Sequence, residues 1–327
     1  MVNENINVSV VLVTFNRKDL LLKCLDAIKH QSYKVSTIYI VDNASTDETP
    51  EMLKKYNYIL ELPPIDISKP WEKVFKFNDI NICYIRMNEN QGGSGGFYTG
   101  MKKAYNDGCD WLWLMDDDGQ PHHNCLENLL NFRKEADFLA PLVINIENKN
   151  ELSFGIFDIV HNQKLKTLQD VQKNTKTKIY EGTANPFNGV LLSKKLIKNI
   201  GYPIKDMFIW GDEAEYLLRT KKKGFKILTI IDAIHYHPKQ KKNTIKILNN
   251  KYELMYEENQ LKYYCYLRNQ AYRYKLYSKK ALISSFLKYS WFFLVSRKID
   301  LNGWIFYIKA YLDGINGNLT KHKKYLK

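Results

Sequence analysis

The chain has 327 residues, of which 45% are hydrophobic and 13% aromatic, enough to bury a sizeable core in one large or two modest domains. Its five cysteines are odd in number and lack CxxC spacing, which argues against a disulfide framework or a cysteine-based zinc site and favours a reducing compartment. From Lys239 onward there are 19 Lys and Arg against 5 Asp and Glu, which accounts for the whole formal net charge of +14. This basic, tyrosine-rich tail predicts an anionic partner, either a phospholipid surface or nucleic acid.

The N-terminal stretch predicts no targeting signal. It runs through Asn3, Glu4 and Asn5 straight into a short apolar segment, without a basic region followed by a long apolar core. We therefore expect no cleaved signal peptide.

The first half of the chain alternates strand and helix patterns. Apolar runs at 8–14, 38–41, 82–85 and 111–115 predict strands, and helical spacing follows the first of them. This alternation predicts right-handed crossovers and a parallel sheet. Ligands of such sheets bind beyond the carboxyl ends of the strands, and polar or glycine-rich sequence follows each of these four.

The rest of the chain is less regular. The proline-containing segment 58–79 is interpreted as an insertion between strands, and residues 145–180 as an irregular stretch with short strands. Clear patterns return at 187–192 and again at 210–237. Beyond Lys239 we expect helices.

Asp116, Asp117 and Asp118 form the strongest chemical signal. Three adjacent carboxylates repel one another, so a strand that delivers them to one edge predicts a compensating cation or positive partner. Hard divalent metals prefer oxygen ligands and are often held by one or two carboxylates plus substrate phosphates. The alternative is a solvated acidic turn.

A glycine run at 92–96 follows Asn90. Glycines such as Gly95 and Gly96 let the backbone approach a ligand closely, and a helix that begins after them would favour phosphate. The run lacks the spacing and the Lys-Ser/Thr ending of a Walker loop and follows the third strand, which disfavours a dinucleotide-binding fold. A flexible hairpin is the alternative.

An acidic cluster at 212–215 opens a predicted helix. The helix dipole stabilises carboxylates there, and a carboxylate in a cleft near an aromatic ring such as Trp210 can also serve as a general base. Farther along, His235 and His237 flank Tyr236 in a predicted strand. We expect at most one of the two histidines to point into a given site, and a lone histidine is usually a satisfied polar residue.

Taken in order, these motifs resemble those of family 2 glycosyltransferases with the GT-A fold, particularly the galactofuranosyltransferase and rhamnosyltransferase branch. The resemblance covers about residues 8–270 and depends on segments 10–17, 41–47, 90–96, 115–119, 210–219 with the later His-Tyr-His, and 263–269. It implies an α/β fold with a mostly parallel, Rossmann-like sheet flanked by helices and a C-terminal helical tail. The implied catalytic domain spans 1–238, with a nucleotide-binding half of about 1–120 and an acceptor half of about 121–238. Residues 239–327 would form a basic, aromatic helical region.

The resemblance also implies roles for single residues. Asp116 and Asp118 would hold Mg²⁺ or Mn²⁺, with His237 the better match to the family's metal-binding histidine and His235 in reserve. Glu213 matches the catalytic base, but many relatives carry two aspartates where this chain has Asp212 and Glu213, which leaves open which of the two acts. A larger set would line the donor pocket: Thr14, Asn16, Arg17, Asp42, Asn90, Gly95, Gly96, Asp116, Asp117 and Trp210.

The resemblance implies an inverting, metal-dependent glycosyltransferase that uses UDP-galactofuranose, with dTDP-rhamnose as the alternative donor. Two other classes are a nucleotidyltransferase and a nucleic-acid-binding protein; the neutral body argues against nucleic acid as the partner. The expected acceptor is a surface-polysaccharide or lipid-linked glycan.

The apolar stretch 281–295 is too short to span a bilayer and contains Lys288. We expect it to lie on an anionic membrane surface, which would place a cytoplasmic enzyme peripherally on the inner face of the cell membrane. The alternative is that these helices pack on the catalytic domain or on another subunit of a homo-oligomer.

Overall fold

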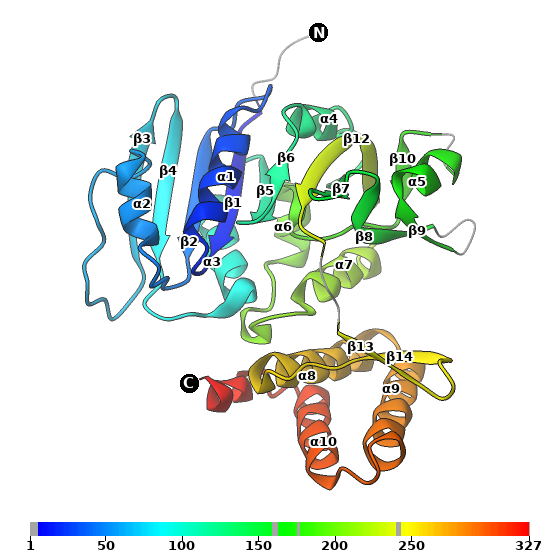
Figure 1. Cartoon of the computed structure of the whole chain (residues 1–327). Coiled ribbons are helices and arrows are strands. Elements are labelled where there is room, and N and C mark those ends of the chain that lie inside the picture. Colours follow the sequence, from blue (N-terminus) through cyan, green and yellow to red (C-terminus); the bar gives the residue numbers. More distant parts are fainter. Residues whose placement is uncertain (1–5, 159–162, 175–176, 240–242, 327) are drawn as a thin grey trace. The chain divides into compact units, whose positions relative to one another are not determined.

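A computed structural model describes residues 6–158, 163–174, 177–239 and 243–326, so the N-terminal residues behind the signal-peptide expectation lie outside it. The chain divides into two compact units (Figure 1). The first comprises Met1–Pro203 and Tyr216–Gln240. The second comprises Ile204–Glu215 and Lys241–Lys327, so a short internal segment belongs with the C-terminal region.

A twisted mixed sheet forms the centre of the first unit, with the strand order β10-β12-β7-β11-β5-β1-β2-β4-β3 (Figure 1). Strands β5, β1, β2 and β4 are mutually parallel, as the sequence predicts, while β3, β11 and β10 run antiparallel to their neighbours. The strands of this path are β1 (Val8–Thr14), β2 (Thr37–Asp42), β3 (Trp71–Phe77), β4 (Ile80–Arg86), β5 (Trp111–Asp116), β7 (Phe138–Asn145), β10 (Ile179–Glu181), β11 (Asn188–Ser193) and β12 (Ile227–His237). Shorter additions are β6 (Gln120–Pro121), β8 (Glu151–Asp158) and β9 (Gln163–Thr167).

Helices cover both faces of this sheet because β1 is apolar on both sides. Val10 and Leu12 pack into one core with α1 (Lys18–Lys29), α2 (Thr49–Lys55) and α4 (Cys125–Leu130). Val11 and Val13 pack into the opposite core with α3 (Gly92–Asn106), α6 (Lys194–Ile200) and the part of α7 (Asp212–Lys222) that begins at Tyr216. Alternate residues of one strand therefore serve two cores, which explains its uninterrupted apolar sequence.

Two sequence interpretations need correction. Segment 58–79 is not only an insertion, because its last part forms β3, an edge strand whose exposed Glu72 and Lys73 suit the boundary of a sheet. Residues 145–180 contain a small folded element in addition to short strands: Val171 of α5 (Leu168–Asn174) packs with Leu165 of β9 in a separate apolar cluster.

The second unit begins its C-terminal part with a hairpin, which the sequence interpretation missed, and continues as the expected helices. The hairpin joins β13 (Thr244–Ile247) to β14 (Tyr252–Met255). After it come α8 (Gln260–Tyr277), α9 (Lys279–Trp291), a π-helical turn η2 (Phe292–Ser296), α10 (Leu301–Asn316) and the 3₁₀ segment η3 (Leu319–Tyr325); η1 (Lys205–Met207) lies in the internal segment. Aromatic residues form its core: Tyr263, Tyr264, Tyr289, Phe292, Phe293, Tyr307 and Tyr311. Within the described ranges, none of the helices has both the length and the apolar character that a bilayer crossing requires.

Candidate functional site

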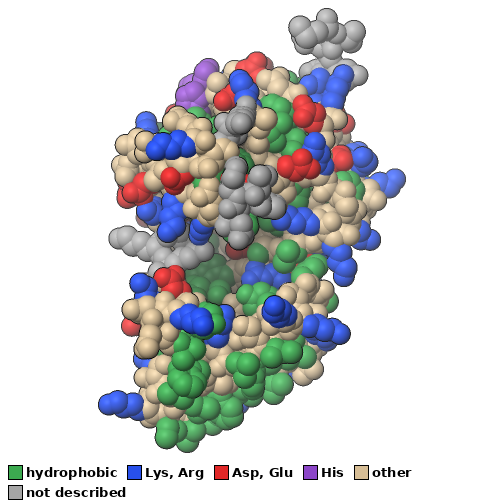
Figure 2. Space-filling model, turned by 90° about the vertical axis from the view of Figure 1, so that its right-hand side faces the viewer, with side chains coloured by type: hydrophobic (Ala, Val, Ile, Leu, Met, Phe, Trp, Pro, Cys, Tyr) green, Lys and Arg blue, Asp and Glu red, His purple; other side chains and the backbone are tan. Residues whose placement is uncertain are grey.

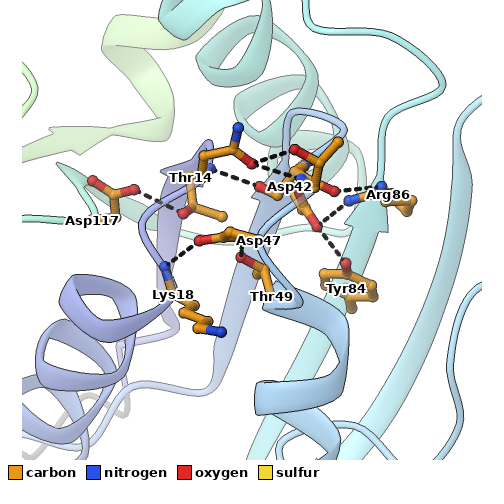
Figure 3. Close-up of polar contacts among 11 residues, drawn as sticks. Thr14, Lys18, Asp42, Asp47, Thr49, Tyr84, Arg86 and Asp117 are labelled. Atoms are coloured by element: carbon orange, nitrogen blue, oxygen red, sulfur yellow. Dashed lines mark hydrogen bonds and ion pairs between the residues drawn. The ribbon is translucent and has the colours of Figure 1, made fainter.

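The carboxyl ends of β1, β2 and β5 meet at one edge of the sheet. In the pairing register Thr14 lies opposite Asp42 on β2, and Val13 lies opposite Asp116 on β5. The Thr14 hydroxyl donates to Asp117 Oδ2 at 2.7 Å, which ties the first strand to the acidic turn (Figure 3). The polar residues that the sequence places after these strands therefore converge, as expected at this edge of a parallel sheet.

Arg17 provides a cation beside the acidic turn. Its Nη1 lies 3.2 Å from Asp117 Oδ1 and 2.9 Å from Asp118 Oδ2, while half of its side chain stays exposed. Burial raises the pKa of Asp117 to about 6, although Arg17 and the Thr14 hydroxyl act in the opposite direction. One arginine therefore bridges two carboxylates and keeps donors available toward solvent.

His237 contacts the same turn from β12. Its Nε2 lies 3.0 Å from Asp118 Oδ1, and its Nδ1 lies 2.6 Å from the carbonyl oxygen of Pro238. A carbonyl can only accept, so Nδ1 carries a proton and Nε2 is the nitrogen that faces the carboxylate. Metal-binding histidines are commonly oriented by such a bond from their other ring nitrogen.

With all three carboxylates ionised, the acidic turn would carry more negative charge than Arg17 and His237 balance. Burial, together with Asp118 and Asp117, raises the pKa of Asp116 to about 8. For Asp118, burial would raise the pKa, but the hydrogen bond and charge of His237 outweigh it and hold the pKa below its usual value. A divalent cation would relieve this repulsion, and carboxylate oxygens with an imidazole nitrogen are suitable ligands.

No group of three or more His, Cys, Asp or Glu side chains in the described part of the chain is already arranged to hold a metal ion. The acidic turn and His237 therefore fit a cation only with additional ligands, such as the phosphates of a bound nucleotide.

His235 lies on the same side of β12 as His237. Both histidines are buried, whereas Ile234, which precedes them, and Tyr236, which lies between them, are only half-buried. Residues two apart in a strand share a face, so strand alternation gives no reason for only one of the two histidines to point toward the site. Within the described residues neither ring nitrogen of His235 has a hydrogen-bond partner, and burial lowers its pKa to about 3, so the ring is neutral. His237, by contrast, lies within hydrogen-bond distance of Asp118, which favours His237 over His235 as the ligand.

Asp42, at the end of β2, connects the loop that follows it to strand β4 (Figure 3). It is fully buried, accepts from the Tyr84 hydroxyl and from Arg86 Nη1 at 2.6 Å each, and also accepts from the backbone N–H of Ser45. Nearby, Asn16 Oδ1 accepts from the Thr46 backbone N–H at 2.6 Å. The sequence interpretation missed Tyr84 and Arg86, although their place on a strand next to β2 is a usable signal.

The glycine run does not form a loop before a helix. Helix α3 begins at Gly92 itself, where the Asn43 side chain donates to the Gly92 carbonyl at 2.9 Å and Asn90 Oδ1 accepts from the Gly92 N–H. A Cβ at Gly96 would lie 2.5 Å from Val13 Cγ1, and one at Gly100 would also meet β1. Gly96 therefore lets a helix pack closely on the sheet, and the expectation that the helix begins only after the glycines is wrong.

Trp210, Asp212 and Glu213 lie in the second unit, where α7 begins. Asp212 is buried, whereas Glu213 is partly exposed and its Oε2 accepts from the Gly211 backbone N–H at 2.9 Å. Glu215 is buried and its Oε1 accepts from the Tyr277 hydroxyl of α8 at 2.8 Å. Of the two acids left open as bases, Glu213 is the one whose side chain reaches solvent.

Comparisons with known proteins agree on the family. Residues 9–192, more than half of the chain, match the family described as Glycosyl transferase family 2. Galactofuranosyltransferase GlfT1 of Mycolicibacterium smegmatis is 28% identical over 306 residues, which cover 91% of this chain and 94% of that protein.

Solved structures show the same architecture. Staphylococcus aureus TarS 1–349 in complex with UDP superposes with a TM-score of 0.53 at 13% identity, over 96% of this chain and 82% of that one. GalNAc-T7 with UDP, GalNAc and Mn²⁺ superposes with a TM-score of 0.52 at 17% identity, over 71% of this chain but only 43% of that one. The predicted fold class is confirmed, and the chain belongs to glycosyltransferase family 2, as a GT-A enzyme that uses a nucleotide-sugar donor.

Proposed function

We propose that the chain transfers galactofuranose from UDP-galactofuranose to a hydroxyl group of a surface-polysaccharide or lipid-linked glycan, with dTDP-rhamnose as the second candidate donor. The observation that carries this proposal is the similarity to GlfT1, which extends over 91% of the chain and thus well beyond the family match that ends at residue 192. Similarity in both units favours a shared reaction rather than a shared nucleotide fold alone.

A donor panel tests the proposal. The purified chain is incubated with an acceptor glycan and either UDP-galactofuranose, UDP-galactopyranose or dTDP-rhamnose, and the glycosylated product is followed by mass spectrometry. We expect transfer from UDP-galactofuranose to exceed that from the other two. Faster transfer of rhamnose would reassign the donor, and equal use of both UDP-galactoses would remove the furanose preference.

The donor site that we propose lies at the carboxyl edge of the sheet. Arg17 supports this placement, because its side chain is half-exposed and its guanidinium, which already bridges Asp117 and Asp118, can also contact phosphate. The other proposed donor residues are Thr14, Asn16, Asp42, Asn90, Gly95, Gly96, Asp116 and Trp210. Among these, buried Asp42 would act mainly by fixing the loop that contains Ser45.

The proposed mechanism is direct displacement with inversion. Glu213 accepts the proton of the acceptor hydroxyl as that oxygen attacks the anomeric carbon, and the electron pair of the breaking bond leaves with the nucleoside diphosphate. Partial exposure supports Glu213 over the buried Asp212. Asp116, Asp118 and His237 would hold Mg²⁺ or Mn²⁺, which would stabilise the negative charge of the departing diphosphate.

We further propose that the second unit binds an anionic membrane surface, which would bring the enzyme to a lipid-linked acceptor on the inner face of the cell membrane. Ile283, Leu287, Trp291 and Val295 recur at intervals of four along α9 and η2 and are 61%, 61%, 42% and 51% exposed. Figure 2 shows hydrophobic side chains gathered over this unit, with lysines and arginines around them. An exposed apolar stripe beside basic residues suits a helix that lies in the headgroup region.

Vesicle sedimentation tests this membrane proposal. We expect the chain to sediment with phosphatidylglycerol-containing vesicles but not with phosphatidylcholine vesicles, and high salt should weaken the binding. Replacing Ile283 and Leu287 with serine should reduce binding, whereas Val74→Ser, which changes an exposed apolar residue of β3, should not. If both variants sediment like the wild type, or if the stripe variant instead loses a concentration-dependent dimer, the stripe is no membrane contact.

A further inference from the structure

The segment that leads into α7 has an unusual backbone. Phe208 forms a tight three-residue turn with φ 68° and ψ −68°, closed by a hydrogen bond of 2.8 Å from the Ile209 N–H to the Met207 carbonyl. Trp210 follows with φ 60° and Gly211 with φ 97°. Positive φ is costly for large aromatic residues and persists only where the surrounding structure holds it in place.

Asn269 of α8 supplies much of that support. Its Nδ2 lies 2.9 Å from the carbonyl oxygen of Met207, 3.1 Å from that of Ile209 and 2.7 Å from that of Trp210. The side chain is almost completely buried, so no water replaces these contacts. Only the NH₂ group of the amide can donate, and it is therefore the group that faces the segment.

Arg268 fixes the orientation of that amide. Its Nε donates to Asn269 Oδ1 at 3.0 Å, and its Nη2 donates to the Met207 carbonyl at 2.9 Å. Its Nη1 donates to the Leu319 carbonyl of η3, and the whole side chain is buried. Arg268 of α8 thus joins the internal segment to η3, near the C-terminal end of the same unit.

One peptide group connects this network to Glu213. The Trp210 carbonyl, which accepts from Asn269, and the Gly211 N–H, which donates to Glu213 Oε2 at 2.9 Å, belong to the same planar unit. Rotation of this peptide group would move both hydrogen bonds together. When Asn269 fixes the orientation of the Trp210 carbonyl, it therefore also fixes the direction in which the Gly211 N–H points toward Glu213.

We infer that Arg268 and Asn269 are positioning residues for catalysis, which hold the Trp210–Gly211 peptide group and through it the carboxylate of Glu213. The inference depends on the proposed role of Glu213 as the base. It makes the C-terminal unit a working part of the glycosyltransferase, because α8 keeps a strained segment in the conformation that orients the base. Displacing a catalytic group by about 1 Å can lower a rate by about 100-fold.

Asn269→Asp tests the inference, because aspartate keeps the shape of the side chain and its bond with Arg268 but cannot donate to the three carbonyls. We expect kcat to fall by about 100-fold, with UDP affinity within about threefold of wild type. Hydrogen exchange of the amides in 204–215 should become faster. Gln270→Ala is the matched control, since this neighbour on α8 donates to the Tyr266 hydroxyl instead, and it should leave all three measurements near wild type.

Gly211→Ala is a second variant in case Asn269→Asp does not fold. A Cβ there would lie 3.3 Å from Asn269 Cβ at a backbone φ of 97°, so the same peptide group should shift and kcat should again fall selectively. Combining Asn269→Asp with Glu213→Gln should cost no more than Glu213→Gln alone, because both changes act through one carboxylate.

The outcomes of these experiments distinguish failure of the proposed base, Glu213, from failure of the positioning role of Arg268 and Asn269. Normal turnover by Glu213→Gln would refute the proposed base and with it the catalytic role of the pair. An inactive Glu213→Gln together with unchanged kcat and hydrogen exchange in Asn269→Asp would refute the positioning role alone, as would multiplicative losses in the double variant.

Discussion

Asp116 in the first unit and Asp313 in the second are both largely withdrawn from solvent, yet their surroundings differ in kind. Asp313 is buried and accepts from the Tyr264 hydroxyl at 2.7 Å and from Lys321 Nζ at 2.6 Å. Burial alone would raise its pKa, but these hydrogen bonds outweigh it and hold the pKa below its usual value. Asp116 lies beside two more carboxylates, and its pKa is raised to about 8.

The comparison separates a structural carboxylate from a ligand-binding one. Donors of the protein itself satisfy Asp313, so its charge stabilises the fold. If all three were ionised, the carboxylates at 116–118 would have an excess of negative charge that Arg17 and His237 only partly balance, and together with burial this repulsion raises the pKa of Asp116. Folds tolerate such local conflict mainly where a ligand later relieves it.

The largest expected effect comes from the acidic turn. Asp118→Asn should lower turnover by at least about 100-fold, because it removes a proposed metal ligand. The protein should still fold, with a somewhat lower melting temperature, because the lowered pKa of Asp118 means that its charge interacts favourably with His237 and Arg17. Steady-state rates across a Mn²⁺ titration and a thermal melt measure both effects.

Asp26→Asn, an exposed change on α1, is the control for this variant and should be neutral in both assays. Near-normal turnover of Asp118→Asn in limiting metal would show that the acidic turn is not the metal site.

Glu213→Gln should follow in size, with a loss of about 100-fold or more in kcat and unchanged UDP binding, because amide replaces carboxylate without change of shape. Asp212→Asn is its comparison and should be milder, given the burial of Asp212. Single-turnover kinetics with calorimetric UDP titration distinguish the two. If Asp212→Asn is far more damaging while UDP binding is intact, the base is Asp212.

Asp313→Asn should reduce stability rather than chemistry, by about 2 kcal/mol at neutral pH, since it removes a charged acceptor from buried donors. The pKa of Asp313 is lowered in the folded state, so its contribution is complete above the ordinary value of about 3.9 and disappears as the pH falls through the folded-state value. Urea unfolding of both proteins should therefore show a difference that narrows in acid. A constant difference at all pH values would mean that charge is not involved.

The sequence predicts the first unit better than the second for physical reasons. The apolar runs of β1, β2, β4 and β5 and the polar residues after them are local signals, and their convergence follows from parallel topology alone. The bonds of Asn269 to Met207 and Trp210 join residues about sixty positions apart and depend on positive φ values that no local pattern reveals. The tyrosines of α8 likewise indicate a helix but not which partners fill its core.

The glycine run gives the smallest and sharpest test, because two glycines of one helix should respond in opposite directions. A Cβ at Gly96 would lie 2.5 Å from Val13 Cγ1, so Gly96→Ala must push α3 away from β1, at a cost of about 1–3 kcal/mol. Apart from its chain neighbours and its own helix backbone, no described residue has an atom within 4 Å of a Cβ added at Gly93, so Gly93→Ala should stabilise the helix by about 0.5–1 kcal/mol. Chemical unfolding of both variants measures the contrast.

Turnover and UDP affinity of Gly93→Ala test the role of the glycine run in a second way. If the run serves helix packing, Gly93→Ala should keep wild-type turnover and UDP affinity, because its methyl group meets nothing in the protein. A marked loss of UDP affinity in Gly93→Ala, with stability increased, would instead show that a ligand approaches the backbone at the start of α3. That result would add Gly93 to Gly95 and Gly96 among the proposed donor contacts and would show that the run serves binding as well as packing.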